Sequence, residues 1–274
     1  MAEQSGARHR LRYDVNLSML FTELPLLRRP EAARKAGFDA IEFWWPFQQA
    51  VPDDADVDAF VSAVSDAGVR LVGLNFFAGD MPSGDRGLVS WVGRETEFRD
   101  SVDVAIGIAR RLDCRTFNAL YGNRIDGVEP ARQDELALST LDYLAGVVEP
   151  VGGQVVLEPL SAAPKYPLRT AAEAVAVLDK LGRANVTLLA DLYHLAVNGD
   201  DLGGVIDEYA GRVGHVQVAD APGRGEPGSG ELDIDGCLAA LESAGYAGYV
   251  GLEYKPTSDS QSSLHWLPRE RRAL

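Results

Sequence analysis

Residues 66–76, DAGVRLVGLNF, decide the fold, because a helical pattern ends in them at a glycine and a buried strand follows at once. The same step recurs as AGFDAIEFWW at residues 36–45 and as AGYAGYVGLEY at residues 244–254. A glycine that ends a helix and leads directly into an apolar run is typical of the loop between a helix and a strand. We therefore expect strands and helices to alternate along the chain.

Eight strand candidates occur, and helical periodicity fills the intervals between them. The strands are expected at residues 13–20, 40–45, 70–77, 115–122, 154–160, 186–194, 213–220 and 249–256. The helices are expected at residues 27–38, 54–68, 94–113, 134–152, 170–182, 201–212 and 233–246. A doubly wound sheet is the competing α/β architecture, but it more often has fewer strands and a glycine-rich loop after the first. Eight units in 274 residues favour a single (β/α)8 TIM barrel.

The chain divides into three parts around this barrel. We expect a disordered leader at residues 1–12, the barrel domain at residues 13–257 and a C-terminal tail at residues 258–274. The tail carries an apolar patch, Leu264 to Leu267, that packs either on the barrel or on a second copy of the chain. A homo-oligomer is therefore one of two open alternatives.

Composition excludes several classes of partner. The net charge of −15 argues against binding to nucleic acid or to an anionic membrane surface, since both require a surplus of Lys and Arg. The sequence shows neither a signal peptide nor an apolar run long enough to span a bilayer. Cys114 and Cys237 lie far apart and are interpreted as small core residues in a reducing compartment. These features predict a cytoplasmic protein that acts on a small molecule.

Polar side chains stand where the apolar part of each predicted strand ends. In a (β/α)8 barrel the carboxyl ends of the strands form the active-site face. The strand-end residues are Asn16, Glu42, Asn75, Asn118, Glu158, Asp191, His194, Gln217, Asp220, Glu253 and Lys255.

Four of these residues come from neighbouring strands and carry oxygen. Glu158, Asp191, Gln217 and Glu253 end the predicted strands five to eight, and three of them are carboxylates. A lone glutamate at a strand end is more often salt-bridged than a ligand, but three grouped carboxylates would each need a separate buried partner. A divalent cation offsets that cost, and all-oxygen ligands favour Mg²⁺ or Mn²⁺.

Other polar residues keep two interpretations each. Glu42 either belongs to the site or pairs with an Arg or Lys, and His194 is either a core histidine or a donor to substrate. His215 either lines the site or fills the barrel interior. Arg224 either meets a substrate carboxylate bidentately or is a solvated loop residue.

Two long loops on the expected active-site face are rich in glycine. They span residues 79–95, after the third strand, and residues 220–233, after the seventh. Long connections of this kind are usually functional or mobile, and lids are expected at this face.

The chain resembles the hydroxypyruvate isomerase family, within the wider group of xylose-isomerase-like barrels. The resemblance covers most of residues 13–256 in order. Its matching stretches are NLSMLF (16–21), GFDAIEFWWP (37–46), NFFAGDMPSGDRG (75–87), GRETEFR (93–99), LLADLYHLAVNGDDL (188–202), GHVQVADAPGRGEPGSGELD (214–233) and GYAGYVGLEYKP (245–256).

The resemblance implies roles for the strand-end residues. It implies a metal ion held by Glu158, Asp191, Gln217 and Glu253, with Glu158 and Glu253 also acting as the acid/base pair. It places His194 and Arg224 on the substrate. We add Glu42, Asn75 and Lys255 to the expected substrate contacts because they stand at predicted strand ends on the same face.

The function that the resemblance implies is metal-assisted isomerisation of an α-hydroxy-carbonyl acid through an enediol(ate), with hydroxypyruvate and tartronate semialdehyde as the leading pair. A ketose 3-epimerase and a 2-oxo-tetronate isomerase use the same proton chemistry, although related epimerases have a histidine at the position of Gln217. Endonuclease IV-type enzymes share the barrel but need many histidines, and this chain has four. A non-catalytic barrel that binds sugar acids is the alternative from another class.

Overall fold

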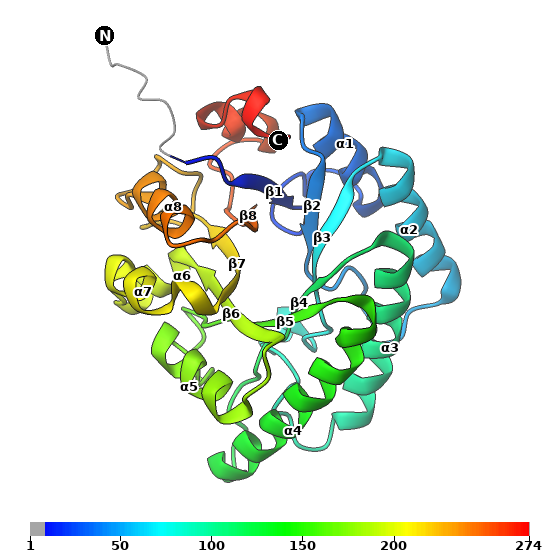
Figure 1. Ribbon diagram of the computed structural model, residues 1–274. Helices are drawn as coiled ribbons and strands as arrows, with labels where there is room; N and C mark the ends of the chain where they lie inside the picture. Colours follow the sequence, from blue (N-terminus) through cyan, green and yellow to red (C-terminus); the bar gives the residue numbers. More distant parts are fainter. Residues whose placement is uncertain (1–8, 274) are drawn as a thin grey trace.

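Eight parallel strands close into a barrel in the computed structural model, which describes residues 9–273 (Figure 1). The strands are β1 (Arg12–Asn16), β2 (Ala40–Phe43), β3 (Arg70–Asn75), β4 (Thr116–Asn118), β5 (Gln154–Leu157), β6 (Val186–Asp191), β7 (Val213–Val218) and β8 (Tyr249–Leu252). β1 pairs with both β2 and β8, with Val15 opposite Ile41 on one side and opposite Leu252 on the other. This double pairing closes the sheet and confirms the predicted (β/α)8 barrel.

Helices cover the outside of the barrel (Figure 1). They are α1 (Arg29–Ala36), α2 (Asp54–Ala67), α3 (Glu95–Leu112), α4 (Pro130–Val148), α5 (Ala171–Leu181), α6 (Leu192–Asn198), α7 (Leu202–Tyr209), α8 (Ile234–Ser243) and the short α9 (Ser260–Ser263). Gly37 and Gly68 end α1 and α2 at φ 108° and 66°, the left-handed conformation that glycine adopts without a Cβ clash. Across residues 9–273, every helix is too short or too polar to cross a bilayer.

The predicted strands begin within one residue of the observed ones but run two to four residues too far. The extra residues lie beyond the ends of the ladder, and several of them, including Trp44, Phe77 and Glu253, line a cavity above the barrel. Residues 192–194, predicted as strand, begin α6 instead. Asp191 causes this switch, because its side chain accepts hydrogen bonds from the backbone N–H groups of Tyr193 and His194 and so caps the helix.

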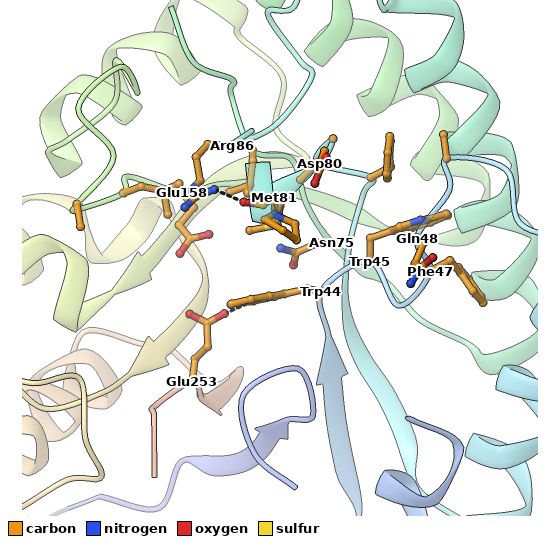
Figure 2. Close-up of a pocket in the computed structure, with 18 of the residues that line it drawn as sticks. Trp44, Trp45, Phe47, Gln48, Asn75, Asp80, Met81, Arg86, Glu158 and Glu253 are labelled. Atoms are coloured by element: carbon orange, nitrogen blue, oxygen red, sulfur yellow. Dashed lines mark hydrogen bonds between the residues drawn. The ribbon is translucent and has the colours of Figure 1, made fainter. Parts of the chain in front are cut away.

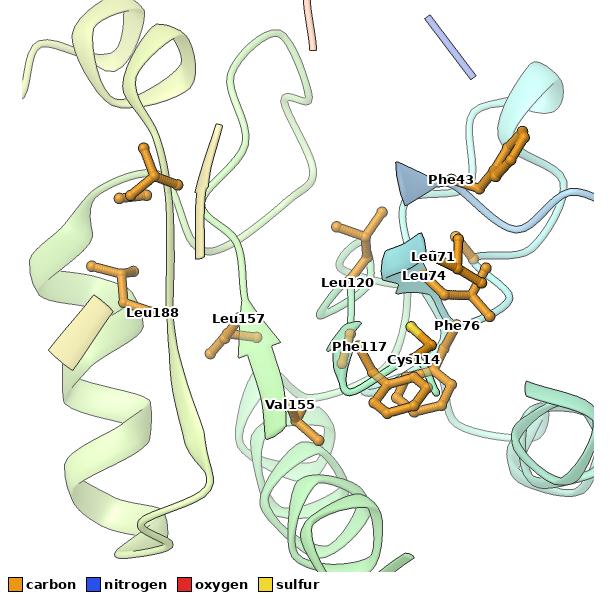
Figure 3. Close-up of a cluster of buried hydrophobic side chains, with 14 of the residues drawn as sticks. Phe43, Leu71, Leu74, Phe76, Cys114, Phe117, Leu120, Val155, Leu157 and Leu188 are labelled. Atoms are coloured by element: carbon orange, nitrogen blue, oxygen red, sulfur yellow. The ribbon is translucent and has the colours of Figure 1, made fainter. Parts of the chain in front are cut away.

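The core between strands and helices is aliphatic and aromatic (Figure 3). Phe76 and Phe117 stack with ring centroids 5.3 Å apart, and Phe43 meets Phe60 of α2 edge to face. Cys114 lies in this core, and burial raises the pKa of its thiol to about 12. A thiol in that state is unreactive, as the interpretation of Cys114 as a small core residue requires.

The C-terminal tail packs on the barrel beside α1 and the start of β1 (Figure 1). Leu264 is fully buried, and Trp266 meets Tyr13 of β1 edge to face. The Arg272 guanidinium donates to the carbonyl oxygens of Ala36, Leu264 and Leu267. Of the two alternatives for the apolar patch, the structure therefore shows packing on the barrel, and the oligomeric state stays a prediction.

The predicted leader lies mostly outside the described residues. Its described part, residues 9–12, contacts the barrel: His9 and Leu11 are buried, the His9 ring lies 3.1 Å from the Tyr13 hydroxyl, and Arg12 begins β1.

Leu264→Ala is expected to lower the free energy of unfolding by about 2–4 kcal/mol, because it opens a cavity under a fully buried side chain. Urea unfolding followed by circular dichroism measures the loss. The neighbouring His265→Ala variant is the control, since His265 is exposed and should change stability by less than about 0.5 kcal/mol. Equal stability of Leu264→Ala and the wild type would show that the tail is not part of the folded barrel.

Candidate active site

A cavity of about 1120 Å³ opens at the carboxyl ends of the strands (Figure 2). Its floor is polar and is reached by Glu158 after β5, His194 of α6 and Glu253 after β8. Its outer wall is aromatic and includes Trp44 and Trp45 from the loop after β2. The side chains that could carry chemistry therefore converge on one point from segments far apart in the sequence.

Glu158, Asp191, His194 and Glu253 form the centre of the floor. Each offers one potential ligand atom, and these four atoms lie within 4.8 Å of one another. The most exposed of the four residues, His194, has only 5% of its surface accessible. Gln217 of β7 joins the group, because it pairs with Asp191 in the sheet and its Nε2 lies 3.3 Å from Glu253 Oε1. The four residues predicted to hold a metal ion are thus brought together.

Neighbouring donors fix the two glutamates. Asn118 Nδ2 donates to Glu158 Oε2 over 2.6 Å. Trp44 Nε1 donates to Glu253 Oε1, and Arg224 Nη2 donates to Glu253 Oε2, each over 2.5 Å. Figure 2 shows the Trp44 indole reaching Glu253 across the cavity.

Two buried oxygens in this group have no hydrogen-bond partner among the described residues. They are Asp191 Oδ2 and Gln217 Oε1. A buried acceptor without a partner is costly, and a cation bound between the carboxylates would satisfy Asp191 Oδ2. The cluster is therefore compatible with a metal site, and its oxygen-rich donor set suits a hard cation.

Burial and mutual repulsion act on the three carboxylates. Burial raises the pKa of Glu158 well above its ordinary value, and the charges of Glu253 and Asp191 raise it further. Burial also raises the pKa of Glu253 to about 7, although Arg224 opposes the change. The pKa of Asp191 is raised by burial as well. Without a cation, the group resists carrying three negative charges.

His194 enters the cavity as a neutral ring with a defined tautomer. Its Nδ1 accepts from the backbone N–H of Ser161 over 3.0 Å, so the remaining proton of the neutral ring lies on Nε2. Nε2 faces Asp191 Oδ2 at 3.6 Å and Glu158 Oε1 at 3.9 Å. Burial, assisted by Arg224, lowers the pKa of His194 to about 3. His194 can therefore donate a hydrogen bond at the cavity floor without adding a charge.

Glu42 lies beneath this floor, outside the cavity wall. It accepts from Gln217 Nε2 at 2.7 Å and Asn16 Nδ2 at 3.0 Å, and its Oε2 lies 2.7 Å from His215 Nε2. Burial opposes ionisation of Glu42, but His215, Gln217 and Asn16 outweigh it and lower its pKa. The structure thus pairs Glu42 with His215 rather than with an Arg or Lys, and it places His215 in the barrel interior.

Glu42 sets the orientation of the Gln217 amide. A carboxylate only accepts hydrogen bonds, so the Gln217 NH2 group must face Glu42 and the amide oxygen must face away from it. Room for the Glu42 side chain comes from Gly251 of β8, where a Cβ would stand 2.6 Å from Glu42 Oε1. No pattern in the sequence distinguishes this supporting role from a place in the cavity wall.

The other predicted substrate contacts divide into two groups. Asn75 and Arg224 line the cavity, but Arg224 is already paired with Glu253. The Lys255 side chain is exposed and lies outside the cavity lining, while its backbone N–H donates to Arg224 O. Sequence reasoning missed the bond from Trp44 to Glu253.

Both long loops above the strands are held by internal bonds. Asp220 is fully buried and accepts from the backbone N–H groups of Gly228 and Leu232, which folds residues 220–233 over β7. In residues 79–95, Asp85 accepts from Asp80 N and from Arg94 Nη1, each over 2.8 Å. The loops therefore form fixed parts of the cavity wall in this structure.

Comparison with known proteins identifies the barrel. A family model described as xylose isomerase-like TIM barrel matches residues 30–270. The chain belongs to the xylose isomerase-like TIM-barrel family. Among members with curated names, an Escherichia coli hydroxypyruvate isomerase is 33% identical, with 94% of this chain and 98% of the relative covered. A Streptomyces coelicolor protein provisionally named hydroxypyruvate isomerase is 52% identical, with 96% and 97% covered.

Two further relatives in the xylose isomerase-like family have other names. A 2-oxo-tetronate isomerase of Haemophilus influenzae is 30% identical, with 94% of this chain and 98% of the relative covered. A crystal structure titled AP endonuclease, family 2, from Brucella melitensis superposes with a TM-score of 0.85 at 37% identity, covering 93% and 97% of the two chains. The curated names confirm the prediction of an isomerase at the level of enzyme class.

Glu158→Gln is expected to stabilise the protein in the presence of a chelator. At pH 8 the unfolded chain carries an ionised Glu158, a form that burial and its neighbours disfavour in the folded protein, so the neutral amide should raise the free energy of unfolding by roughly 1–3 kcal/mol. Because the folded-state pKa is raised, the penalty is absent below the unfolded pKa. The advantage of the variant should therefore shrink as the pH falls toward about 4.5.

Urea unfolding at pH 8 and pH 5 measures this difference. Glu97→Gln is the matched control, because Glu97 also lines the cavity but pairs with Arg94, which lowers its pKa. That variant should lose up to about 1 kcal/mol instead of gaining stability. A Glu158→Gln protein less stable than the wild type at pH 8 would contradict the electrostatic account of the cluster.

Proposed function

We propose that this protein is a metal-dependent isomerase that interconverts an α-hydroxy-carbonyl acid through an enediolate, with hydroxypyruvate and tartronate semialdehyde as the leading pair. The observation that carries the proposal is the placement of Glu158 and Glu253. Both are buried, both line the cavity, and both share one cluster with Asp191. The curated relatives named hydroxypyruvate isomerase support the choice of substrate.

The residues of the floor fit a divalent cation. Glu158, Asp191, Gln217 and Glu253 would hold it, since oxygens of the three carboxylates converge, and Asp191 Oδ2 and Gln217 Oε1 have no hydrogen-bond partner among the described residues. The chemistry that a bound Mg²⁺ or Mn²⁺ supplies is Lewis-acid polarisation of two neighbouring substrate oxygens. The negative charge of the three carboxylates, which burial alone makes unfavourable, would then be balanced by the cation.

Glu158 and Glu253 move the protons of the reaction. One glutamate removes a proton from C3 of hydroxypyruvate, and the other delivers a proton to C2. The hydroxyl proton passes from the oxygen on C3 to the oxygen on C2, and exchange with solvent restores both carboxyl groups. The enediolate formed between these steps carries negative charge on oxygen, where the neutral His194 Nε2–H is placed to donate.

The cavity walls protect this intermediate from water. Trp44 closes one side and contacts Glu253 directly, and Trp45 and Phe47 extend the aromatic wall outward. Excluding water strengthens the electrostatic interactions at the floor and limits loss of the reactive intermediate.

A four-carbon 2-oxo-tetronate is the second candidate substrate. The cavity of about 1120 Å³ has room for more than a three-carbon acid, and the Haemophilus influenzae relative carries the corresponding name. The proton chemistry is the same for both acids, so the two candidates differ only in the length of the chain that the outer cavity accepts.

Glu158→Gln and Glu253→Gln should each lower kcat by about 10²-fold to 10⁴-fold, because each removes one of the two groups that transfer protons. Turnover of hydroxypyruvate and 2-oxo-tetronate in D₂O, followed by NMR, measures the rate and the position of deuterium. The wild type should place deuterium at C2 of the product. Glu31→Gln, a change on the exposed surface of α1, is the control and should keep full activity.

Three results of this experiment would contradict the proposed mechanism or activity. Full activity in either glutamine variant would exclude the two-glutamate mechanism. Deuterium at C3 of an uncharged ketose, with no turnover of acids, would assign a 3-epimerase. The absence of both exchange and metal binding would favour a non-catalytic barrel.

Addition of Mn²⁺ is expected to raise the Tm of the wild type, since a ligand that binds only the folded state stabilises it. Glu42→Gln should weaken Mn²⁺ binding by about 10-fold to 100-fold, because the Gln217 amide loses the carboxylate that orients it. Titration calorimetry compares the two proteins, with Glu31→Gln again as the control. Unchanged Mn²⁺ affinity in Glu42→Gln would show that Glu42 does not orient the ligand.

A further inference from the structure

Three arginines line the cavity, and two of them are already paired with carboxylates. Arg94 contacts Asp85 at 2.8 Å and Glu97 at 2.6 Å. Arg224 contacts Glu253 at 2.5 Å. The positive charges of Arg94 and Arg224 are therefore already balanced by carboxylates of the protein.

Arg86 differs from both. Through Nη1 it donates to the carbonyl oxygens of Met81, at 3.0 Å, and Asp85, at 2.6 Å. Among the described residues, no carboxylate forms an ion pair with it, and its Nε and Nη2 groups have no protein acceptor. Figure 2 shows the guanidinium directed toward the part of the cavity where Glu158 lies. A half-buried cation in this position can bind an anion that enters the cavity.

The backbone around Arg86 is fixed before any ligand arrives. Gly87 has φ 104°, and a Cβ at this position would stand 1.9 Å from Leu120 O, so only glycine fits. Gly87 N donates to Ala78 O at 2.9 Å. Together with the bonds that Asp85 accepts from Asp80 and Arg94, these contacts hold the loop against the top of the barrel. A preorganised cation binds an anion at a lower entropic cost than a mobile one.

We propose that Arg86 binds the carboxylate of the substrate and thereby selects acids over uncharged sugars. The inference rests on the proposed function for the position of the reacting carbons, which it places between Glu158 and Glu253. An acid in this cavity also meets the negative charges of Asp80 and Glu97 on the wall. Arg86 is the lining cation left to offset that repulsion, whereas Arg224, first expected in this role, is held by Glu253.

A matched pair of substrates separates recognition of the carboxylate from the reaction itself. Dihydroxyacetone carries a CH₂OH group where hydroxypyruvate carries its carboxylate, and both undergo the same 1,2-isomerisation. Arg86→Met should lower kcat/KM for hydroxypyruvate by roughly 10-fold to 100-fold, the usual effect of losing a charged hydrogen-bonding partner. The rate with dihydroxyacetone should change by less than about twofold. Arg86→Lys should fall between the wild type and Arg86→Met, because it keeps the charge and loses the planar fork.

Arg110→Met, on the exposed face of α3, controls for the loss of one positive charge and should leave both substrates unaffected. An equal loss of activity toward both substrates would overturn the proposal, because it would assign Arg86 a merely structural role. Dihydroxyacetone phosphate is the third substrate of the panel. Faster conversion of this phosphate than of hydroxypyruvate would assign Arg86 to a phosphate and overturn the carboxylate assignment.

Equilibrium binding keeps the inference independent of turnover. Calorimetric titration of hydroxypyruvate into the Mg²⁺-supplied wild type and Arg86→Met should show weaker binding to the variant by a similar factor. Weaker binding in the variant without turnover by the wild type would support the role of Arg86 and refute the proposed reaction. Equal binding to both proteins, or no binding to either, would overturn the role of Arg86.

Discussion

The interaction on which the rest of the site depends is the repulsion among Glu158, Asp191 and Glu253 inside a buried cluster. Removing a carboxylate from water is costly, and grouping three of them adds to that cost. Burial and the neighbouring charges shift the pKa of each carboxylate upward, which expresses this cost directly. A barrel that places such a group at its mouth loses stability there and gains a cluster of oxygens compatible with a metal site.

The surrounding residues keep the cluster from relaxing. Asn118 donates a hydrogen bond to Glu158, and Trp44 and Arg224 donate hydrogen bonds to Glu253. One oxygen of Asp191 accepts a hydrogen bond from the first turn of α6 and so caps that helix. The carboxylates therefore cannot turn away from one another to reach solvent. Their remaining oxygens stay directed at one point, which is the geometry that metal binding and proton transfer require.

Buried glutamates in adjacent layers of the barrel have pKa values that are shifted in opposite directions. The glutamates of the floor have raised pKa values, whereas Glu42, one layer below, has a lowered pKa because His215, Gln217 and Asn16 surround it. An ionised Glu42 is a fixed acceptor that orients the Gln217 amide. All of these carboxylates are buried, so the difference arises from the neighbouring charges: His215 lowers the pKa of Glu42, whereas Asp191 and Glu42 add to the effect of burial on the pKa of Glu253.

The sequence by itself determined the alternation of strands and helices, the eightfold barrel, and the residues of the floor. Those signals are local, because glycine steps, apolar runs and a charge after a strand are all visible in short windows. Only the tertiary structure decided which side chains meet. Glu42 and Lys255 share the strand-end pattern with Glu253, yet Glu42 lies under the floor and Lys255 points to solvent. Arg86 and Arg224 are alike as loop arginines, but Glu253 pairs with Arg224, whereas no carboxylate among the described residues pairs with Arg86. The partners lie well apart in the chain, 29 positions for Arg224 and Glu253 and 175 for Glu42 and Gln217, so these roles follow from the folded barrel and not from any short stretch of the chain.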